Sequence, residues 1–158
     1  MKKEIIILIF SWVVIISLYF WKVPSRLKGR AQIAFLLGQT IAWMYVFLSV
    51  YFKRVEFPFR EFPNATKLSF SLHYLIYPAF AMFFEVTYPS SNSRTKIILH
   101  YAFFVVITNL YTYFIGHYTE LARPLKNEFL NIPIFAFLLF VAHHFNRWFQ
   151  KGMKEANT

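Results

Sequence analysis

The chain alternates between long apolar stretches and short polar segments that carry most of its charges. The apolar stretches cover residues 5–21, 31–52, 68–88, 97–118 and 129–145. A transmembrane helix needs roughly 20 mostly apolar residues, a length that the three middle stretches reach and the first and fifth approach. The pattern predicts an all-α fold, an integral membrane helical bundle of about five transmembrane helices that forms one domain over residues 1–158.

Aromatic side chains support these boundaries independently of hydropathy, because amphipathic rings prefer the headgroup region of a bilayer. They lie at or near the ends of the predicted spans, at Trp21, Tyr51, Phe52, Tyr88, Tyr101, Tyr118 and Trp148. Lys2 and Lys3 before the first apolar run resemble the start of a signal peptide, but the bulky residues 19–22 stand where a cleavage site would need small ones. We expect an uncleaved first helix.

Composition agrees with a membrane location and narrows the chemistry. Of the 158 residues, 58% are hydrophobic and 15% are charged, which is more apolar surface than a soluble domain of this length can bury. The chain contains no Cys and no Asp, so disulfides, Cys nucleophiles and Asp-based motifs are excluded. The sequence also lacks nucleophile-elbow, phosphate-loop and H-E-x-x-H motifs. We therefore expect no cofactor and lean against an enzyme.

The net charge of +10 comes from short basic clusters between the apolar runs. Such clusters suit anionic lipid headgroups, at about 1 kcal/mol per Lys or Arg near the surface, better than they suit nucleic acid. Lys and Arg number eight on the side of the N-terminus and nine on the other side. Because the two sides carry nearly equal numbers of basic residues, the positive-inside rule hardly discriminates between the two orientations. Only the dense first loop favours an N-terminus outside the cell membrane.

Several polar side chains fall inside or near the predicted spans, where an ionisable group needs a partner or a function. They are His73, Glu85, His100, Asn109, His117, His143 and His144. Antiparallel helices would bring Glu85, His100 and His143 to one membrane face, which makes them candidates for a metal or proton site. Their places near the span ends favour solvated interfacial side chains instead, so we expect no metal.

Two positions in the spans predict polar packing between helices. Asn109 is central in its span and is expected to hydrogen-bond across to another helix. Gln39 adjoins a ridge of small residues, Ala34, Gly38 and Ala42, whose spacing favours close helix contact. Pro78 lies in the middle of the third span, where the missing N–H predicts a local distortion of the helix.

The second and fourth loops lie on the same side of the predicted bundle and carry alternating charges. Glu56, Arg60, Glu61 and Lys67 alternate with Phe and Pro residues in the second loop, and the fourth contains the run Tyr118-Thr119-Glu120-Leu121. The rings are expected to lie in the membrane interface with the charges toward water. The carboxylates and cations form either one ion-pair network or a solvated fringe, because exposed ion pairs are worth only 0 to about 1 kcal/mol.

These segments carry a resemblance to a known family. The shared pattern is Val55-Glu56-Phe57-Pro58, Arg60-Glu61-Phe62, Ala65-Thr66-Lys67, Ser69-Phe70, Tyr77-Pro78, Tyr88-Pro89, Tyr118-Thr119-Glu120-Leu121 and Arg147-Trp148-Phe149. In order and spacing it resembles an uncharacterised family of small multi-spanning membrane proteins from spore-forming Firmicutes. The resemblance implies a bacterial cell membrane and a shared fold, and it carries no activity. Its pattern does not include His73, Glu85, His143 or His144.

Three functions remain open from the sequence. The first is a non-enzymatic membrane protein that recognises membrane lipids, another membrane protein or a second copy of itself through the charged interfacial loops. The second is a small transporter or a substrate-binding membrane subunit that uses the polar mid-membrane residues. The third is a membrane-embedded enzyme or metal protein. We expect the first.

Overall fold

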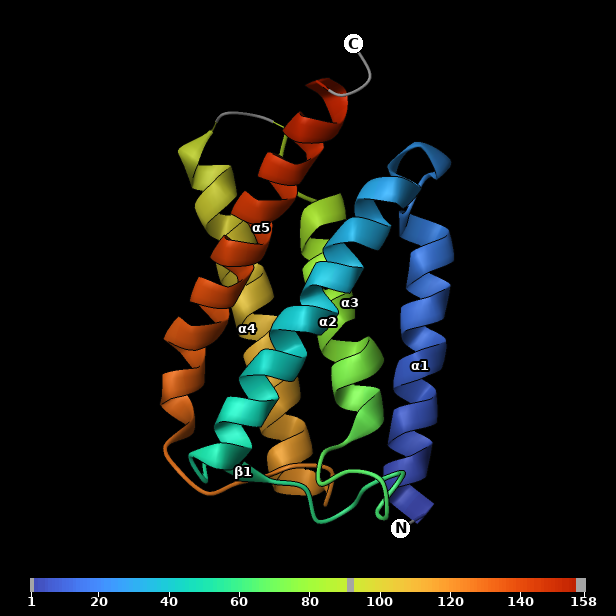
Figure 1. Cartoon of the computed structure of the whole chain (residues 1–158), viewed down its shortest axis with the longest axis vertical. Coiled ribbons are helices and arrows are strands. Elements are labelled where there is room, and N and C mark those ends of the chain that lie inside the picture. Colours follow the sequence, from blue (N-terminus) through green and yellow to red (C-terminus); the bar gives the residue numbers. More distant parts are fainter. Residues whose placement is uncertain (1, 91–92, 156–158) are drawn as a thin grey trace.

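The chain folds into five helices that run side by side and a pair of loops that closes one end of the bundle (Figure 1). The computed structural model describes residues 2–90 and 93–155. The helices are α1 (Lys2–Lys22), α2 (Lys28–Tyr51), α3 (Tyr77–Val86), α4 (Arg94–Tyr118) and α5 (Asn131–Glu155). Short helical turns cover Ser25–Leu27, Leu72–Ile76 and Glu128–Leu130, and the strands β1 (Val55–Glu56) and β2 (Arg123–Pro124) pair antiparallel.

Four of the helical segments are long and apolar enough to cross a membrane: Lys3–Lys22, Ser25–Tyr51, Arg94–Tyr118 and Glu128–Met153. The predicted third span, 68–88, contains a shorter apolar helix, Leu72–Val86, because its first residues belong to the preceding loop. The fifth helix is longer than predicted and continues from 145 to Glu155. The all-helical fold is therefore confirmed, and the third helix departs from the expected length.

The outside of the bundle carries many large apolar side chains, and small and polar residues are among those buried inside. Phe10, Phe20 and Ile98 are 68%, 76% and 67% exposed. Ala31, Ala34 and Ser49 are buried. A soluble domain would bury its large apolar side chains, so the arrangement suits a hydrocarbon solvent.

The ridge of small residues on α2 is the surface on which α3 packs. Ala34, Gly38 and Ala42 are all buried. A Cβ added to Gly38 would lie 3.0 Å from the Cβ of Ala81 and 3.1 Å from the Cα of Pro78. The two backbones approach closely here because Gly38 has no side chain, as the spacing of the ridge predicted.

Pro78 distorts the helix that contains it, and a side chain of α2 compensates. A proline has no N–H to donate to the carbonyl four residues earlier, which here belongs to Tyr74. The Leu72–Ile76 turn just before Pro78 is a π-helix, and Gln39 donates its Nε2 hydrogen to the Tyr74 carbonyl oxygen at 2.6 Å. The freed backbone acceptor is thus satisfied by a neighbouring helix, as a dry environment requires.

This arrangement predicts that Gln39 and Pro78 are energetically coupled. We expect Gln39→Leu to lower the free energy of unfolding by about 1 to 3 kcal/mol, because it leaves the Tyr74 carbonyl without a donor. In a Pro78→Ala background the restored backbone N–H should reduce that loss. Unfolding of the four proteins of this double-mutant cycle in mixed micelles measures the coupling. Additive losses would contradict the assignment.

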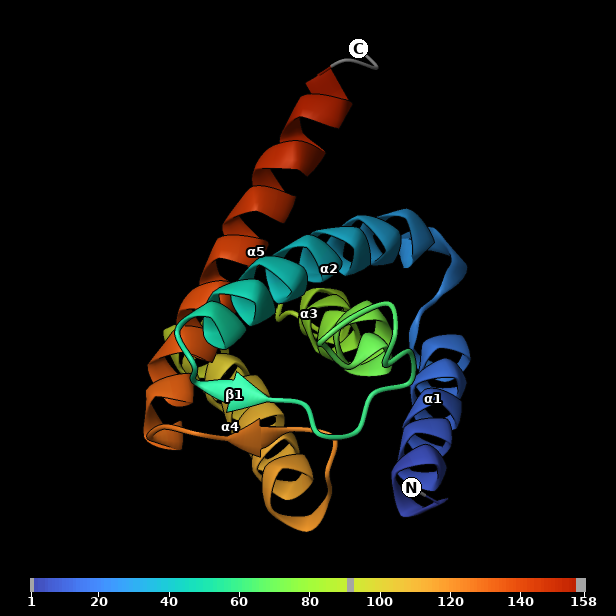
Figure 2. The same cartoon turned by 60° about the horizontal axis from the view of Figure 1, so that its bottom comes forward.

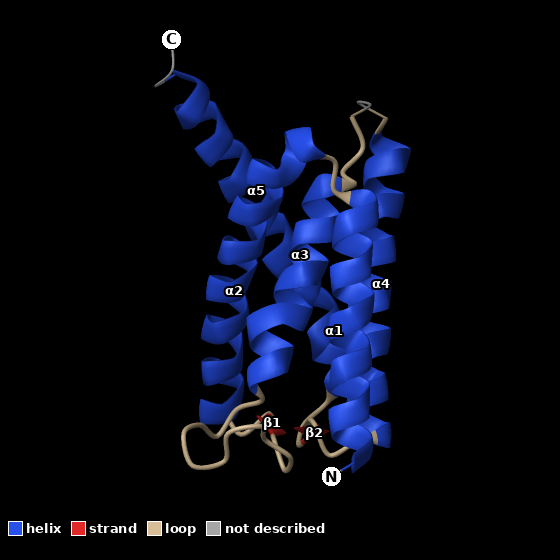
Figure 3. Cartoon of the chain, turned by 90° about the vertical axis from the view of Figure 1, so that its right-hand side faces the viewer, coloured by secondary structure: helices blue, strands red, loops and turns tan. Residues whose placement is uncertain are grey.

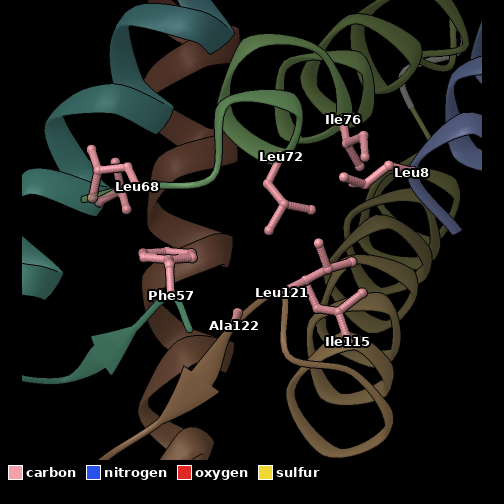
Figure 4. Packing of buried hydrophobic residues seen from close by; sticks show 9 residues of the cluster. Leu8, Phe57, Leu68, Leu72, Ile76, Ile115, Leu121 and Ala122 are labelled. Carbon is pink, nitrogen blue, oxygen red and sulfur yellow. The ribbon is translucent and has the colours of Figure 1, made fainter. Parts of the chain in front are cut away.

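The loops at the end of the bundle near the N-terminus are packed into its core (Figures 3 and 4). Leu121, from the loop after α4, is fully buried beside Leu72 and Ile115. Phe57, from the loop after α2, belongs to the same cluster. The loops are therefore part of the packed core at this end of the bundle. Burial of apolar side chains, and not only ion pairs, holds them in place.

Candidate functional site

Residues 52–69 and 119–130 form what we call the loop layer, which covers one end of the bundle (Figure 2). β1 and β2 pair Val55 with Pro124 and Glu56 with Arg123. Two further backbone bonds extend this pairing, from the N–H of Phe59 to the Glu120 carbonyl and from the N–H of Leu125 to the Arg54 carbonyl, both at 2.8 Å. The two loops are thus joined through their backbones.

One ion-pair group in the loop layer involves three side chains. Arg123 donates to Glu56 at 3.1 Å and to Glu120 at 2.8 Å, and all three side chains are about half exposed. Among the described residues, Arg60 and Lys67 have no ion-pair partner, and the backbone carbonyl of Tyr118 accepts from Lys3 at 3.4 Å. The sequence predicted an extended network or a solvated fringe, and the structure contains a small group that joins the two loops.

Glu61 has a different task, because its carboxylate caps the helical segment that begins at residue 70. It accepts hydrogen bonds from the N–H of Phe70 at 3.0 Å, the N–H of Ser71 at 2.8 Å and the hydroxyl of Ser69 at 3.1 Å. A carboxylate at this place satisfies free backbone donors and complements the helix dipole. Glu61 thus holds the loop layer against the beginning of the third helix.

We expect Glu61→Ala to lower the free energy of unfolding by about 1 to 2 kcal/mol, the usual cost of losing a helix cap. Hydrogen exchange should rise at Phe70 and Ser71, whose N–H groups lose their acceptor. Glu120→Ala is the matched control, because it removes a half-exposed carboxylate of the same layer that bonds no helix N–H group. Equal exchange in the two variants would contradict the capping role.

Above the loop layer, the bundle encloses a cavity of about 120 Å³ between α2, α3, α4 and α5. Its wall is mostly apolar, with hydroxyl and imidazole groups among the apolar side chains. Arg54, Lys126 and Glu128 lie at its loop-layer end. Toward the opposite end the lining stops at Gly38, Ala81 and Ala142. Charged residues of the loop layer therefore lie at one end of the cavity.

Two buried side chains in this wall have a polar atom without a partner among the described residues. His73 is 4% exposed, and its Nδ1 lies 2.8 Å from the Ser69 carbonyl oxygen. A carbonyl only accepts, so Nδ1 carries the proton and Nε2 of the neutral ring is a free acceptor. The hydroxyl of Ser49, also 4% exposed, makes no hydrogen bond with the described side chains or backbone. The cavity thus offers one acceptor and one hydroxyl.

Other polar groups of the wall are already paired and fix its shape. Tyr45 lies 3.0 Å from Oδ1 of Asn131, to which its hydroxyl donates, and the hydroxyls of Tyr77 and Thr112 lie 3.2 Å apart. At the loop-layer end, Glu128 lies 3.6 Å from His117. Arg54 and Lys126 have no ion-pair partner in the described part of the chain. These two cations are free to meet an anion.

At the opposite end of the bundle, Glu85 joins three helices. Its Oε1 lies 2.6 Å from Nδ1 of His143 on α5, and its Oε2 accepts from Arg30 on α2 at 2.9 Å. Glu85 and His143 are 1% and 3% exposed, and the ring of Tyr88 stacks on His143 at 4.0 Å. The expectation of solvated side chains is wrong for this pair, because α3 and α5 pack these faces together.

His100, the third metal candidate, bonds neither Glu85 nor His143. Nε2 of His100 lies 3.0 Å from the carbonyl oxygen of Phe84, which uses that nitrogen as a donor. His144 is exposed and bonds the backbone of its own helix. Within residues 2–90 and 93–155, no group of three or more His or Glu side chains is placed to hold a metal ion. The arrangement of Glu85, His143 and Arg30 is a buried ion-pair group that connects helices, and none of the three lines the cavity.

The two predicted sites of polar packing have different outcomes. Gln39 bonds across to the third helix, as described above. Asn109 donates its Nδ2 hydrogen to the Val105 carbonyl oxygen of its own helix at 2.8 Å, and among the described residues it forms no hydrogen bond to another helix. Short polar side chains can reach the carbonyl one turn earlier, which satisfies them without a second helix.

Sequence reasoning missed the roles of Arg30, Ser49 and the pair of Arg54 and Lys126. Arg30 and Arg54 were counted as loop charges, and Ser49 lies among apolar residues of the second span. A small polar residue inside an apolar run was the available signal for Ser49. Nothing local distinguishes the cations, because their places depend on how the loops fold back over the bundle.

Comparison with protein-family models, with curated proteins and with solved structures found no match to this chain.

Proposed function

We propose that this chain is a non-enzymatic, multi-pass protein of the bacterial cell membrane that binds a small anionic amphiphile at the loop layer. Four apolar helices of spanning length and the shorter α3 between them support the membrane location. The apolar part of the ligand would enter the cavity, and its anionic group would lie by Arg54 and Lys126. The resemblance to small membrane proteins of Firmicutes supports the same location and is part of the proposal.

The observation that carries the proposal is a cavity with unpartnered polar atoms in its wall and two cations without an ion-pair partner at its loop-layer end. Nε2 of His73 and the hydroxyl of Ser49 are not among the fully buried atoms that lack a partner, so both keep some exposure. A ligand that supplies partners for them gains hydrogen bonds worth about 0.5 to 1.5 kcal/mol each. Nε2 of His73 calls for a donor, such as a hydroxyl group. Arg54 and Lys126 call for an anion. Together they describe an amphiphile with a hydroxyl and a carboxylate or phosphate.

The cavity volume limits how much of the ligand is enclosed. Small-molecule pockets usually have about 300 to 1,000 Å³, and an engineered cavity of about 150 Å³ binds benzene. The cavity of about 120 Å³ therefore holds one ring or a short stretch of hydrocarbon. The remainder of an amphiphile would extend into the loop layer.

The loop layer remains the recognition surface expected from the sequence, but different residues of the layer are proposed to contact the ligand. Glu56 and Glu120 are bonded to Arg123, and Glu61 is bonded to the third helix. These side chains hold the loops in place over the cavity. Recognition is assigned to the cations that have no partner.

A binding measurement on the purified full-length protein in phosphatidylcholine nanodiscs tests the proposal, with radiolabelled decanoate and decanol as probes. We expect saturable decanoate binding that weakens about tenfold in Arg54→Gln/Lys126→Gln, since the loss of a charge-assisted contact is worth about 1.4 kcal/mol or more. Decanol binding should not change. Arg94→Gln/Lys96→Gln, at the opposite end, is the matched control. Absent saturation, or equal weakening in both double variants, would overturn the proposal.

A second candidate is a small transporter or substrate-binding subunit, favoured by the same cavity. Transport requires access from both sides of the membrane, and the lining stops where Gly38 contacts Pro78 and Ala81. α2 and α3 would have to separate there. Decanoate efflux from proteoliposomes, compared with protein-free liposomes of the same lipids, decides between the two functions. Efflux at the protein-free rate would exclude transport of this probe.

A further inference from the structure

A second hollow lies on the outside of the bundle between α1 and α2. It has a volume of about 570 Å³ and is lined almost entirely by apolar side chains. Ile15 and Tyr19 line it from α1, Phe35 and Leu36 from α2, and Met82 from α3. This groove shares no residue with the cavity above the loop layer. Its volume falls in the usual range for ligand sites, about 300 to 1,000 Å³.

The groove ends at a basic connection. Residues 22–28 join α1 to α2 at the end of the bundle opposite the loop layer (Figure 1). Lys22, Arg26 and Lys28 are exposed, and no Glu side chain among the described residues forms an ion pair with any of them. At 1.5 Å per helical residue, Lys22 lies about 4.5 Å along α1 from Tyr19, and Lys28 about 6 Å along α2 from Gln32. Lys22 and Lys28 therefore lie within about one helical turn of residues that line the groove, and Arg26 lies in the connection between them.

An aromatic ring marks the depth of this end in the bilayer. Trp21 is 74% exposed, and the Lys22 ammonium lies 4.0 Å from the centre of its ring. Exposed Trp rings prefer the headgroup region, and so do Lys side chains at helix ends. The cations are thus at headgroup level when the groove is at acyl-chain level. An apolar groove with cations at headgroup level suits a molecule that has an acyl chain and an anionic headgroup.

From this geometry we propose that the groove between α1 and α2 binds one anionic phospholipid. An acyl chain lies along Ile15, Phe35 and Leu36, and the phosphate group lies among Lys22, Arg26 and Lys28. A zwitterionic lipid fills the groove equally well but gains less from the cations, because it carries no net negative charge. The site is separate from the proposed amphiphile site, because the two hollows share no lining residue.

Bound lipid has a structural consequence for α1. The main contacts of α1 with the remainder of the bundle are at the Leu72–Ile76 turn, and Ser11 bonds Tyr111 of α4 at 3.1 Å. The half of α1 that follows Ser11 borders the groove. An acyl chain there fills the space between α1 and α2 and holds this half of α1 in place.

Native mass spectrometry of the full-length protein tests the site, with phosphatidylglycerol and phosphatidylcholine of identical acyl chains added to the delipidated protein in detergent. We expect one phosphatidylglycerol to be retained about tenfold more strongly than phosphatidylcholine. The variant Lys22→Gln/Arg26→Gln/Lys28→Gln should lose this preference. Arg94→Gln/Lys96→Gln removes cations from the same end of the bundle, at the start of α4, and should keep it.

A second variant separates the groove from general attraction between charges. Leu36→Trp fills the groove and leaves the three cations in place, so it should weaken retention of both lipids. Helicity and decanoate binding of each variant show that the fold and the other site are intact. Equal retention of the two lipids by the unaltered protein would overturn the proposal. So would an equal loss of preference in the α4 control, or unchanged retention in Leu36→Trp.

Discussion

Replacing Glu85 with alanine is expected to lower the free energy of unfolding by about 3 to 5 kcal/mol, the largest loss among the substitutions considered. The carboxylate is 1% exposed and bonds both His143 and Arg30. Its removal leaves the His143 ring buried without its partner and the Arg30 guanidinium without its counter-charge. It also removes the polar connections of α3 to α2 and α5, because these two bonds reach both helices from one side chain.

Unfolding of the purified protein by sodium dodecyl sulfate in mixed micelles, followed by circular dichroism, measures this loss. Glu56→Ala is the matched control, because Glu56 forms an ion pair that is about half exposed and should lose no more than about 1 kcal/mol. If the two variants unfold alike, the Glu85 group does not stabilise the bundle.

Replacing Gly38 with alanine should lower the free energy of unfolding by about 1 to 3 kcal/mol, although alanine is the better helix former. The new Cβ would lie 3.0 Å from the Cβ of Ala81, 3.1 Å from the Cα of Pro78 and 3.3 Å from its carbonyl oxygen. Two of these atoms belong to the backbone and cannot turn aside as a flexible side chain can. Relief therefore requires α2 and α3 to separate.

Gly152→Ala is the matched control for this substitution, since the same change is made in a helix where nothing lies within 4 Å of the new Cβ. It should stabilise the protein by up to about 1 kcal/mol. Thermal unfolding of both variants in the same detergent measures the comparison. If the α2–α3 contact is tight, the melting temperature falls in Gly38→Ala and rises in Gly152→Ala. A stabilising Gly38→Ala would show that the two helices have room to move.

The two predicted losses concern contacts that hold α3 to its neighbouring helices. Gly38 sets the distance between α2 and α3, and Glu85 sets how α5 lies against them. Between these contacts and the loop layer lies the cavity to which we assign the ligand. Variants that loosen either contact should therefore also weaken decanoate binding, without touching Arg54 or Lys126.

Much of the architecture follows from the order of residues along the chain. The helices, the small-residue ridge around Gly38 and the distortion at Pro78 were all predicted, because each depends on hydropathy, spacing or a missing N–H within a few residues. The third helix is shorter than predicted because residues 68 and 69 belong to a loop. Hydropathy alone does not distinguish an apolar loop from an apolar helix.

Tertiary structure alone decided which polar groups meet. Glu85 was placed at the correct end of the bundle, but its pairing with His143 and Arg30 depends on the rotation of three helices about their axes. Asn109, on α4, bonds the backbone of its own helix, and this outcome also depends on how its helix is rotated about its axis. Hydropathy determines that a segment is helical and apolar, whereas its rotation and depth result from many side-chain contacts at once. The sequence by itself therefore determined the apolar helices, and packing decided the cavity, the groove and their polar partners.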